Sequence, residues 1–166
     1  SRIVRINTDG TRDTSFNTGT GFDNWVNTVA LQADGKVLVG GYFTSFNGTS
    51  RSRLVRLSPD GALDASFVQT GSGFDDSVSE ILVLPDGDIY VGGRFTSYGG
   101  TTSGRIARLN ADGTLDPGFV VSAGFNSDVN ALGLQPDGKL VVGGGFSTYN
   151  GVSCGQVTRL NPDGTR

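Results

Sequence analysis

The fold is decided by the stretch ALQADGKVLVGGYF at residues 30–43. It contains an apolar run, the dipeptide Asp34-Gly35, a second apolar run and the glycine pair Gly40-Gly41. Asp-Gly between two apolar runs is a strong hairpin signal, because glycine accepts the positive φ that a tight turn needs. The stretch therefore predicts two antiparallel strands, which we place at residues 26–32 and 36–43.

The same pattern returns twice along the chain, as ILVLPDGDIYVGGRF at residues 81–95 and LGLQPDGKLVVGGGF at residues 132–146. The three glycine pairs stand 52 and 51 residues apart, and a second Asp-Gly series keeps this spacing. A fixed period of this length indicates a repeat architecture. We divide residues 1–166 into a single array, with units at approximately 2–52, 53–104 and 105–155 and a partial fourth unit at 156–166.

Each unit carries two further predicted strands, at residues 53–57 and 62–67 in the first case, on either side of Pro59-Asp60-Gly61. Four antiparallel strands per period are typical of a β-propeller blade. A parallel β-helix would need shorter rungs, and a parallel α/β sheet would need longer crossovers. The predicted fold class is all-β, with propeller-type blades formed by three four-stranded antiparallel repeats of 51–52 residues.

Three blades are fewer than the ~4–8 of known propellers. We therefore expect other protein chains as partners, including a second copy that completes six blades or extends a longer array. Residues 156–161 repeat residues 3–7, so one of these strands would be redundant in a closed dimer.

Composition excludes several classes of function. The net charge of -3 and the dispersed basic residues disfavour nucleic acid, whose binding depends on Lys and Arg. No apolar run reaches the ~18 residues of a membrane span, and no signal peptide is recognisable. The chain has no Met and opens in mid-pattern, which suggests a processed product or an excerpt. Low Cys content and abundant Gly fit a bacterial extracellular surface.

No catalytic residue and no cofactor are expected, so the chain is predicted not to be an enzyme. It has no His, which excludes a Ser-His-Asp triad, and Cys154 is the single Cys. Asp75 and Asp76 could form a glycosidase pair, but capping a turn explains them more simply.

Two other recurrent patterns have competing explanations. Asn7, Asp9 and Asp13 could contribute oxygen ligands for calcium, but Asp-Gly as a plain turn accounts for the same residues, so no metal site is predicted. Arg56 recurs in every unit together with Asp64. Structural pairing of the two is favoured over an anion-binding ring.

The loop after the second strand supplies the candidate ligand-binding residues. An aromatic residue next to amides or glycines recurs there, as in sugar-binding loops, although packing of the ring into the space beneath its loop is favoured over stacking on a sugar. Trp25, the single Trp, is a candidate partner contact because Trp is enriched at binding hot spots. The ligand-binding candidates are Phe46, Asn47, Tyr98, Tyr149 and Asn150.

The units resemble the bacterial delta-sixty repeat, through RLNADGTLDPGF at residues 108–119, then Gly-Phe and Val, LQPDGKLVVGGGF at residues 134–146 and Tyr-Asn-Gly. The resemblance covers essentially the whole chain and implies a β-propeller-like domain of unknown function. Such repeats occur in large secreted or cell-surface bacterial proteins and phage-associated fibres. Kelch repeats are a weaker comparison, because their Tyr and Trp do not recur here.

The sequence thus predicts a non-enzymatic structural or adhesive interaction module of a bacterial extracellular or phage-like fibre protein. The alternative is a carbohydrate-binding lectin with one loop site per blade, whose partner is a glycan.

Overall fold

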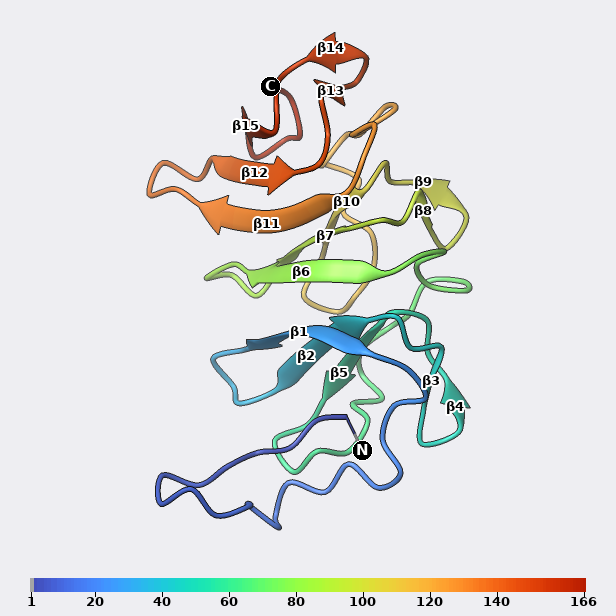
Figure 1. The fold of residues 1–166 in the computed structure, drawn as a ribbon, viewed down its shortest axis with the longest axis vertical. Helices are drawn as coiled ribbons and strands as arrows, with labels where there is room; N and C mark the ends of the chain where they lie inside the picture. Colours follow the sequence, from blue (N-terminus) through green and yellow to red (C-terminus); the bar gives the residue numbers. More distant parts are fainter. Residues whose placement is uncertain (1) are drawn as a thin grey trace.

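A computed structural model describes residues 2–166, which form three three-stranded antiparallel sheets arranged one after another (Figure 1), together with three small two-stranded hairpins. In each sheet the second strand lies between the first and the third. Residues 2–166 contain no helix long and apolar enough to cross a membrane. The strands are β1 (Val26–Leu31), β2 (Val37–Gly41) and β5 (Leu54–Leu57); β6 (Val78–Val83), β7 (Ile89–Gly93) and β10 (Ile106–Leu109); and β11 (Val129–Leu134), β12 (Leu140–Gly144) and β15 (Val157–Leu160).

The first three strands predicted for each unit are confirmed, and so is the all-β class. In the turn between β1 and β2, the Gln32 amide donates to the Lys36 carbonyl and the Gly35 amide donates back to Gln32, with Gly35 at φ +82°. Gly87 and Gly138 have φ values of +95° and +81° in the corresponding turns. The glycine of each Asp-Gly pair therefore allows its hairpin to close.

The fourth predicted strand, residues 62–67, is wrong. Leu63 forms a single bridge with Leu57, after which the chain leaves the sheet. The cause is Asp64, whose Oδ1 accepts hydrogen bonds from the Ser66 amide and hydroxyl at 2.9 and 2.7 Å. This local turn diverts the backbone, and the Val68 amide then donates to the Asp112 carbonyl of the next repeat. Each sheet has three strands, not four.

The loop that follows each second strand forms a small hairpin that was not predicted from the sequence. Its tip is Asn47-Gly48 in the first repeat, with φ values of +49° and +75°. Positive φ at both central residues defines a two-residue type I′ turn, for which Asn-Gly is the preferred sequence. The hairpins are β3 (Ser45–Phe46) with β4 (Thr49–Ser50), β8 (Ser97–Tyr98) with β9 (Thr101–Thr102), and β13 (Thr148–Tyr149) with β14 (Val152–Ser153).

The apolar cores lie between successive sheets. Val78 and Ile81 of the second sheet pack with Leu38 and Leu54 of the first, and an equivalent cluster joins the second and third sheets. A further cluster packs Phe16 of the N-terminal segment against the other side of the first sheet. In Figure 1, β1, β6 and β11 lie one above another, and the marked N- and C-termini lie toward opposite ends of the stack.

The two glycines of each pair have different roles. An added Cβ on Gly40 would lie 2.5 Å from Val78 Cγ1 of the next sheet. An added Cβ on Gly41 would lie 2.1 Å from the Trp25 carbonyl oxygen, where the register of β1 shifts by a bulge. The first glycine thus lets neighbouring sheets approach, and the second accommodates the bulge.

Candidate functional site

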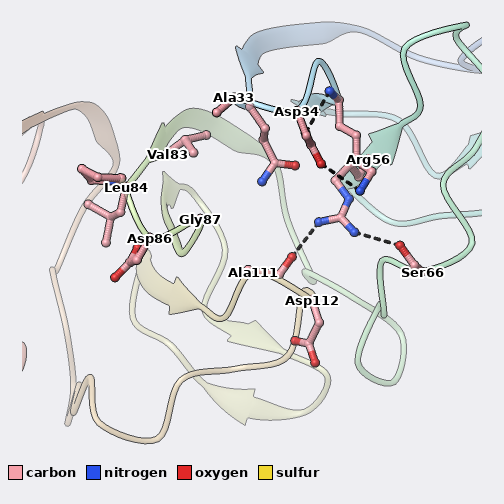
Figure 2. Close-up of a pocket in the computed structure, with 13 residues that line it drawn as sticks. Ala33, Asp34, Arg56, Ser66, Val83, Leu84, Asp86, Gly87, Ala111 and Asp112 are labelled. Atoms are coloured by element: carbon pink, nitrogen blue, oxygen red, sulfur yellow. Dashed lines mark hydrogen bonds and ion pairs between the residues drawn. The ribbon is translucent and has the colours of Figure 1, made fainter.

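A cleft of about 560 Å³ lies between the first and second repeats, at their Asp-Gly turns (Figure 2). Arg56 lies in the cleft with Asp34 and Asp112 around it. The lining residues are Gln32, Ala33, Asp34, Lys36, Arg56, Ser66, Val83, Leu84, Pro85, Asp86, Gly87, Ala111 and Asp112.

Arg56 is buried, and each of its three nitrogens donates a hydrogen bond within the protein. Nε donates to Asp64 Oδ2 at 2.8 Å, Nη1 to the Ala111 carbonyl at 2.6 Å and Nη2 to Ser66 Oγ at 3.1 Å. The guanidinium also lies 4.8 Å from the centroid of the Phe67 ring. The Ala111 bond crosses to the next repeat, so Arg56 joins two repeats and is not presented to an external anion.

The same joint recurs in the neighbouring repeats. Arg5 donates to Asp13 at 2.7 Å and to the Pro59 carbonyl at 2.6 Å. Arg108 donates to Asp88 at 2.9 Å and lies 3.3 Å from Asp116. The predicted structural pairing of this arginine with a carboxylate is therefore observed. Arg159, the last of the series, is exposed.

The remaining polar groups of the cleft offer little converging chemistry. The Lys36 ammonium lies 2.9 Å from Asp34 and 3.7 Å from Asp64. Gln32 Oε1 is buried without a hydrogen-bond partner among the described residues. The carboxylates that line the cleft belong to turns, where Asp34 and Asp112 each accept the backbone amide two residues ahead. The cleft is a groove between repeats, and its buried guanidinium, that of Arg56, is already paired with Asp64.

The predicted ligand-binding rings are placed inside the protein. Phe46, Tyr98 and Tyr149 are only 1%, 1% and 2% exposed. Phe46 packs on Phe22 with ring centroids 4.9 Å apart, and Tyr98 and Tyr149 pack in the same way on the equivalent phenylalanines. A ring that stacks on a sugar must present a face to solvent, so these three rings cannot serve that role in this conformation.

The tyrosine hydroxyls are also used internally. Tyr98 Oη donates to the Gly113 carbonyl at 2.8 Å and accepts the Thr70 amide at 3.2 Å. Tyr149 Oη donates to the Gly164 carbonyl at 2.6 Å, and burial raises the pKa of this hydroxyl to about 12. These bonds connect the second and third small hairpins to the Asp-Gly turns that follow them.

Asn47 and Asn150 are exposed at the hairpin tips, but their side-chain oxygens face the protein. Asn47 Oδ1 accepts the Gly21 amide at 2.8 Å, and Asn150 Oδ1 accepts the Gly124 amide at 2.8 Å. Asn47 and Asn150 were predicted to contact a ligand. Each is followed directly by glycine, and an Asn-Gly pair is typical of a type I′ turn.

Trp25 is the predicted contact that the structure leaves accessible. It is 65% exposed and stands edge-on to Tyr42, with ring centroids 6.0 Å apart. Arg94 lies beside this pair, with Nη1 3.5 Å from Tyr42 Oη and Nε 3.5 Å from Asp128 Oδ2. An apolar ring next to charged groups is the composition found at binding hot spots.

The carboxylates considered for catalysis or calcium serve as local caps. Asp75 Oδ1 accepts the Thr96 and Ser97 amides at 2.8 and 3.0 Å, and Oδ2 accepts the Thr96 hydroxyl. Asp9 and Asp13 each accept an amide and a hydroxyl two residues ahead. In residues 2–166 no three side chains among His, Cys, Asp and Glu are grouped as a metal site would require.

Comparison with known families identifies the repeat. A family model described as a domain of unknown function (DUF5122) beta-propeller matches residues 1–16, 32–67, 84–119 and 135–166. The chain belongs to this family. Its three-stranded sheets are accordingly propeller-type blades. No curated protein and no solved structure matches the chain.

The gaps in the DUF5122 match coincide with one part of each blade. Residues 17–31, 68–83 and 120–134 lie outside it, and they contain β1, β6 and β11 with the connection before each. The matched parts contain the Asp-Gly turns and the arginine joints. Trp25 lies in one of these gaps. It is therefore not part of the family pattern that defines the scaffold of this blade.

Proposed function

We propose that the chain is a non-enzymatic structural and adhesive interaction module of a bacterial extracellular or phage-like fibre protein. The observation that carries this proposal is the use of Arg56. All three nitrogens of the guanidinium in the cleft at the Asp-Gly turns donate hydrogen bonds in a joint between repeats, which suits a scaffold and leaves no free cation for an anion-binding or catalytic site. The resemblance to delta-sixty repeats supports the same assignment.

The adhesive part of the proposal rests on Trp25. Its exposed indole can be covered by a partner at little conformational cost, and Arg94 and Asp128 nearby provide polar contacts at the rim. A contact of this kind binds through area and stacking and requires no reaction.

Binding to immobilised bacterial cell envelope, measured by biolayer interferometry, tests the module. Trp25→Ala should weaken binding about 30-fold or more, since truncation of a central aromatic contact costs about 2 kcal/mol or more. Val152→Ala is the matched control, because Val152 is similarly exposed at 61% but lies at a hairpin in another repeat. Equal binding by the Trp25 variant, or no binding by the unmodified chain, would reject the adhesive role.

A lectin is the second candidate, and Trp25 is again the observation that favours it. An exposed indole with an adjacent guanidinium suits a sugar, whereas the buried rings at 46, 98 and 149 do not. The lectin would then have its site at Trp25 and not one site per blade. A glycan array decides between the candidates: a defined glycan class lost in Trp25→Ala and kept in Tyr98→Phe supports the lectin, and a blank array on folded protein removes it.

A further inference from the structure

The two ends of the stack expose opposite halves of one interface. At the N-terminal end, Val29 and Leu31 of β1 are 54% and 74% exposed. The equivalent residues of the second sheet, Ile81 and Val83, pack between the first and second sheets. Val29 and Leu31 therefore belong to a surface that is covered wherever another sheet precedes it.

The C-terminal end of the stack exposes the other half of this interface. A Cβ on Gly143 would meet only the Ala131 Cβ, at 3.7 Å, whereas the equivalent Gly92 is filled by Val129, at 2.5 Å. Val157 is 65% exposed, although its equivalent Ile106 is fully buried. The third sheet thus leaves Gly143 and Val157 uncovered, whereas the equivalent residues of the first and second sheets are covered by the sheet that follows.

We infer that a second copy of this chain docks head-to-tail, with β1 of one copy packed on β11, β12 and β15 of the other. In this arrangement Val26 of one copy fills the space above Gly143 of its partner, as Val78 does above Gly40. This inference deepens the proposed interaction function by naming the partner as the same chain. The occupant follows from the structure because each internal interface already shows how these two faces fit.

Arginine chemistry supports the same docking. Arg5, Arg56 and Arg108 each reach a turn carbonyl of the following repeat, at Pro59, Ala111 and Pro162. Arg159 occupies the same position in the third sheet but is exposed. A docked second copy brings the turn at Pro59 into reach of Arg159 and completes the series.

β15 and residues 3–7 are equivalent in sequence and would occupy the same position in the assembly. One of the two segments must therefore be displaced. β15 pairs along its length with β12. Ile6 instead forms a single bridge with Arg12, and Val4 and Ile6 are more than half exposed. The N-terminal residues have fewer strand contacts, so we expect β15 of the second copy to displace them, with Arg159 replacing Arg5 at the Pro59 carbonyl.

The faces are heterologous, so docking produces a ring if the rotation closes and a filament if it does not. Two copies supply six blades, within the ~4–8 range of closed propellers. Sedimentation velocity over a concentration series measures the outcome. A species of twice the chain mass, or a concentration-dependent polymer, is expected; a monomer at every concentration overturns the inference.

Two variants separate docking from folding. In the single chain a Cβ at residue 143 meets only Ala131, at an ordinary 3.7 Å, so Gly143→Val should leave the melting temperature of the monomer unchanged, yet weaken association at least tenfold by blocking Val26. Leu31→Asp should do the same from the other face. Val152→Asp is the control and should associate normally, because its equivalent Thr101 is exposed even between neighbours. Association that survives both Gly143→Val and Leu31→Asp overturns the inference. Envelope binding by Gly143→Val, in which Trp25 is unchanged, is measured separately and bears only on adhesion.

Discussion

A methyl group on Gly40 would fall 2.5 Å from Val78 Cγ1, in the adjacent sheet. This distance is shorter than any tolerated carbon–carbon contact, so the spacing of the first two sheets depends on the missing side chain. The same relationship joins Gly92 to Val129, also at 2.5 Å. Close stacking of blades is thus set by one backbone position per repeat.

Gly40→Ala should destabilise the chain by about 1–3 kcal/mol, the usual cost of overpacking a core. Urea unfolding followed by tryptophan fluorescence measures the loss. Gly143→Ala is the matched control and should change the stability of the monomer by less than about 0.5 kcal/mol, because its Cβ would make only an ordinary 3.7 Å contact with Ala131. Equal losses in the two variants would show that the glycine acts through strand propensity and not through sheet spacing.

Arg56→Ala should lower the free energy of unfolding by about 3 kcal/mol, since it leaves Asp64 and the Ala111 carbonyl without their buried partner. Thermal and urea unfolding report the change. Arg159→Ala removes the same residue type from an exposed position and should have little effect in the monomer. An unchanged unfolding midpoint for Arg56→Ala would mean that the joint contributes nothing to stability.

Tyr98→Phe should cost about 1 kcal/mol, the net value of the hydrogen bond from its hydroxyl to Gly113. The ring itself should remain packed, because the first repeat already has Phe46 at this position with the same burial. Tyr98→Ala removes the ring as well and should cost about 3–5 kcal/mol. Denaturant midpoints for the pair separate the two contributions, and similar losses would indicate that the ring contributes little.

Stability should fall as the pH is lowered from about 4 to about 2. Hydrogen bonds from Ser15 and Arg5 lower the pKa of the Asp13 carboxyl to about 2. At Asp64, burial raises the pKa, but hydrogen bonds from Ser66 and Arg56 outweigh it and hold the value at about 2. An aspartate in the unfolded chain titrates near ~3.9. Because the folded values are depressed, this stabilisation is present above the unfolded pKa and lost as the pH falls through the folded one.

The melting temperature measured between pH 7 and pH 2 checks this dependence. Asp64→Asn should begin less stable and show a shallower fall below pH 4, since it no longer takes up a proton on unfolding. A melting temperature that stays constant down to pH 2 in the unmodified chain would contradict the assignment.

Much of the fold could be predicted because its signals are local. The Asp-Gly turn at residues 34–35 and its flanking apolar runs placed β1 and β2 within two residues of their observed ends. The failure at residues 62–67 was also local, because Asp64 captures the amide of Ser66 and turns the backbone out of the sheet.

The candidate site was harder to predict, since burial depends on neighbours distant in sequence. Tyr98 stands in a polar loop, where packing was favoured over the alternative of stacking on a sugar. It packs on Phe74 and donates a hydrogen bond to the Gly113 carbonyl of the following turn. The Asn-Gly and Gly-Gly pairs beside these aromatics could have identified the small hairpins. Nothing in the sequence indicates which of Trp25 and Tyr98 is exposed.

The sequence by itself determined the period, the hairpins and the division into repeats, because glycine conformations and strand alternation are set by adjacent residues. The tertiary structure alone decided what ALQADGKVLVGGYF does at each position: Gly40 receives Val78 of the next sheet, while Leu31 is uncovered. Packing between sheets joins residues about fifty positions apart, and exposure is fixed by whether a neighbouring sheet is present. The same residue type is therefore core in one repeat and surface in another.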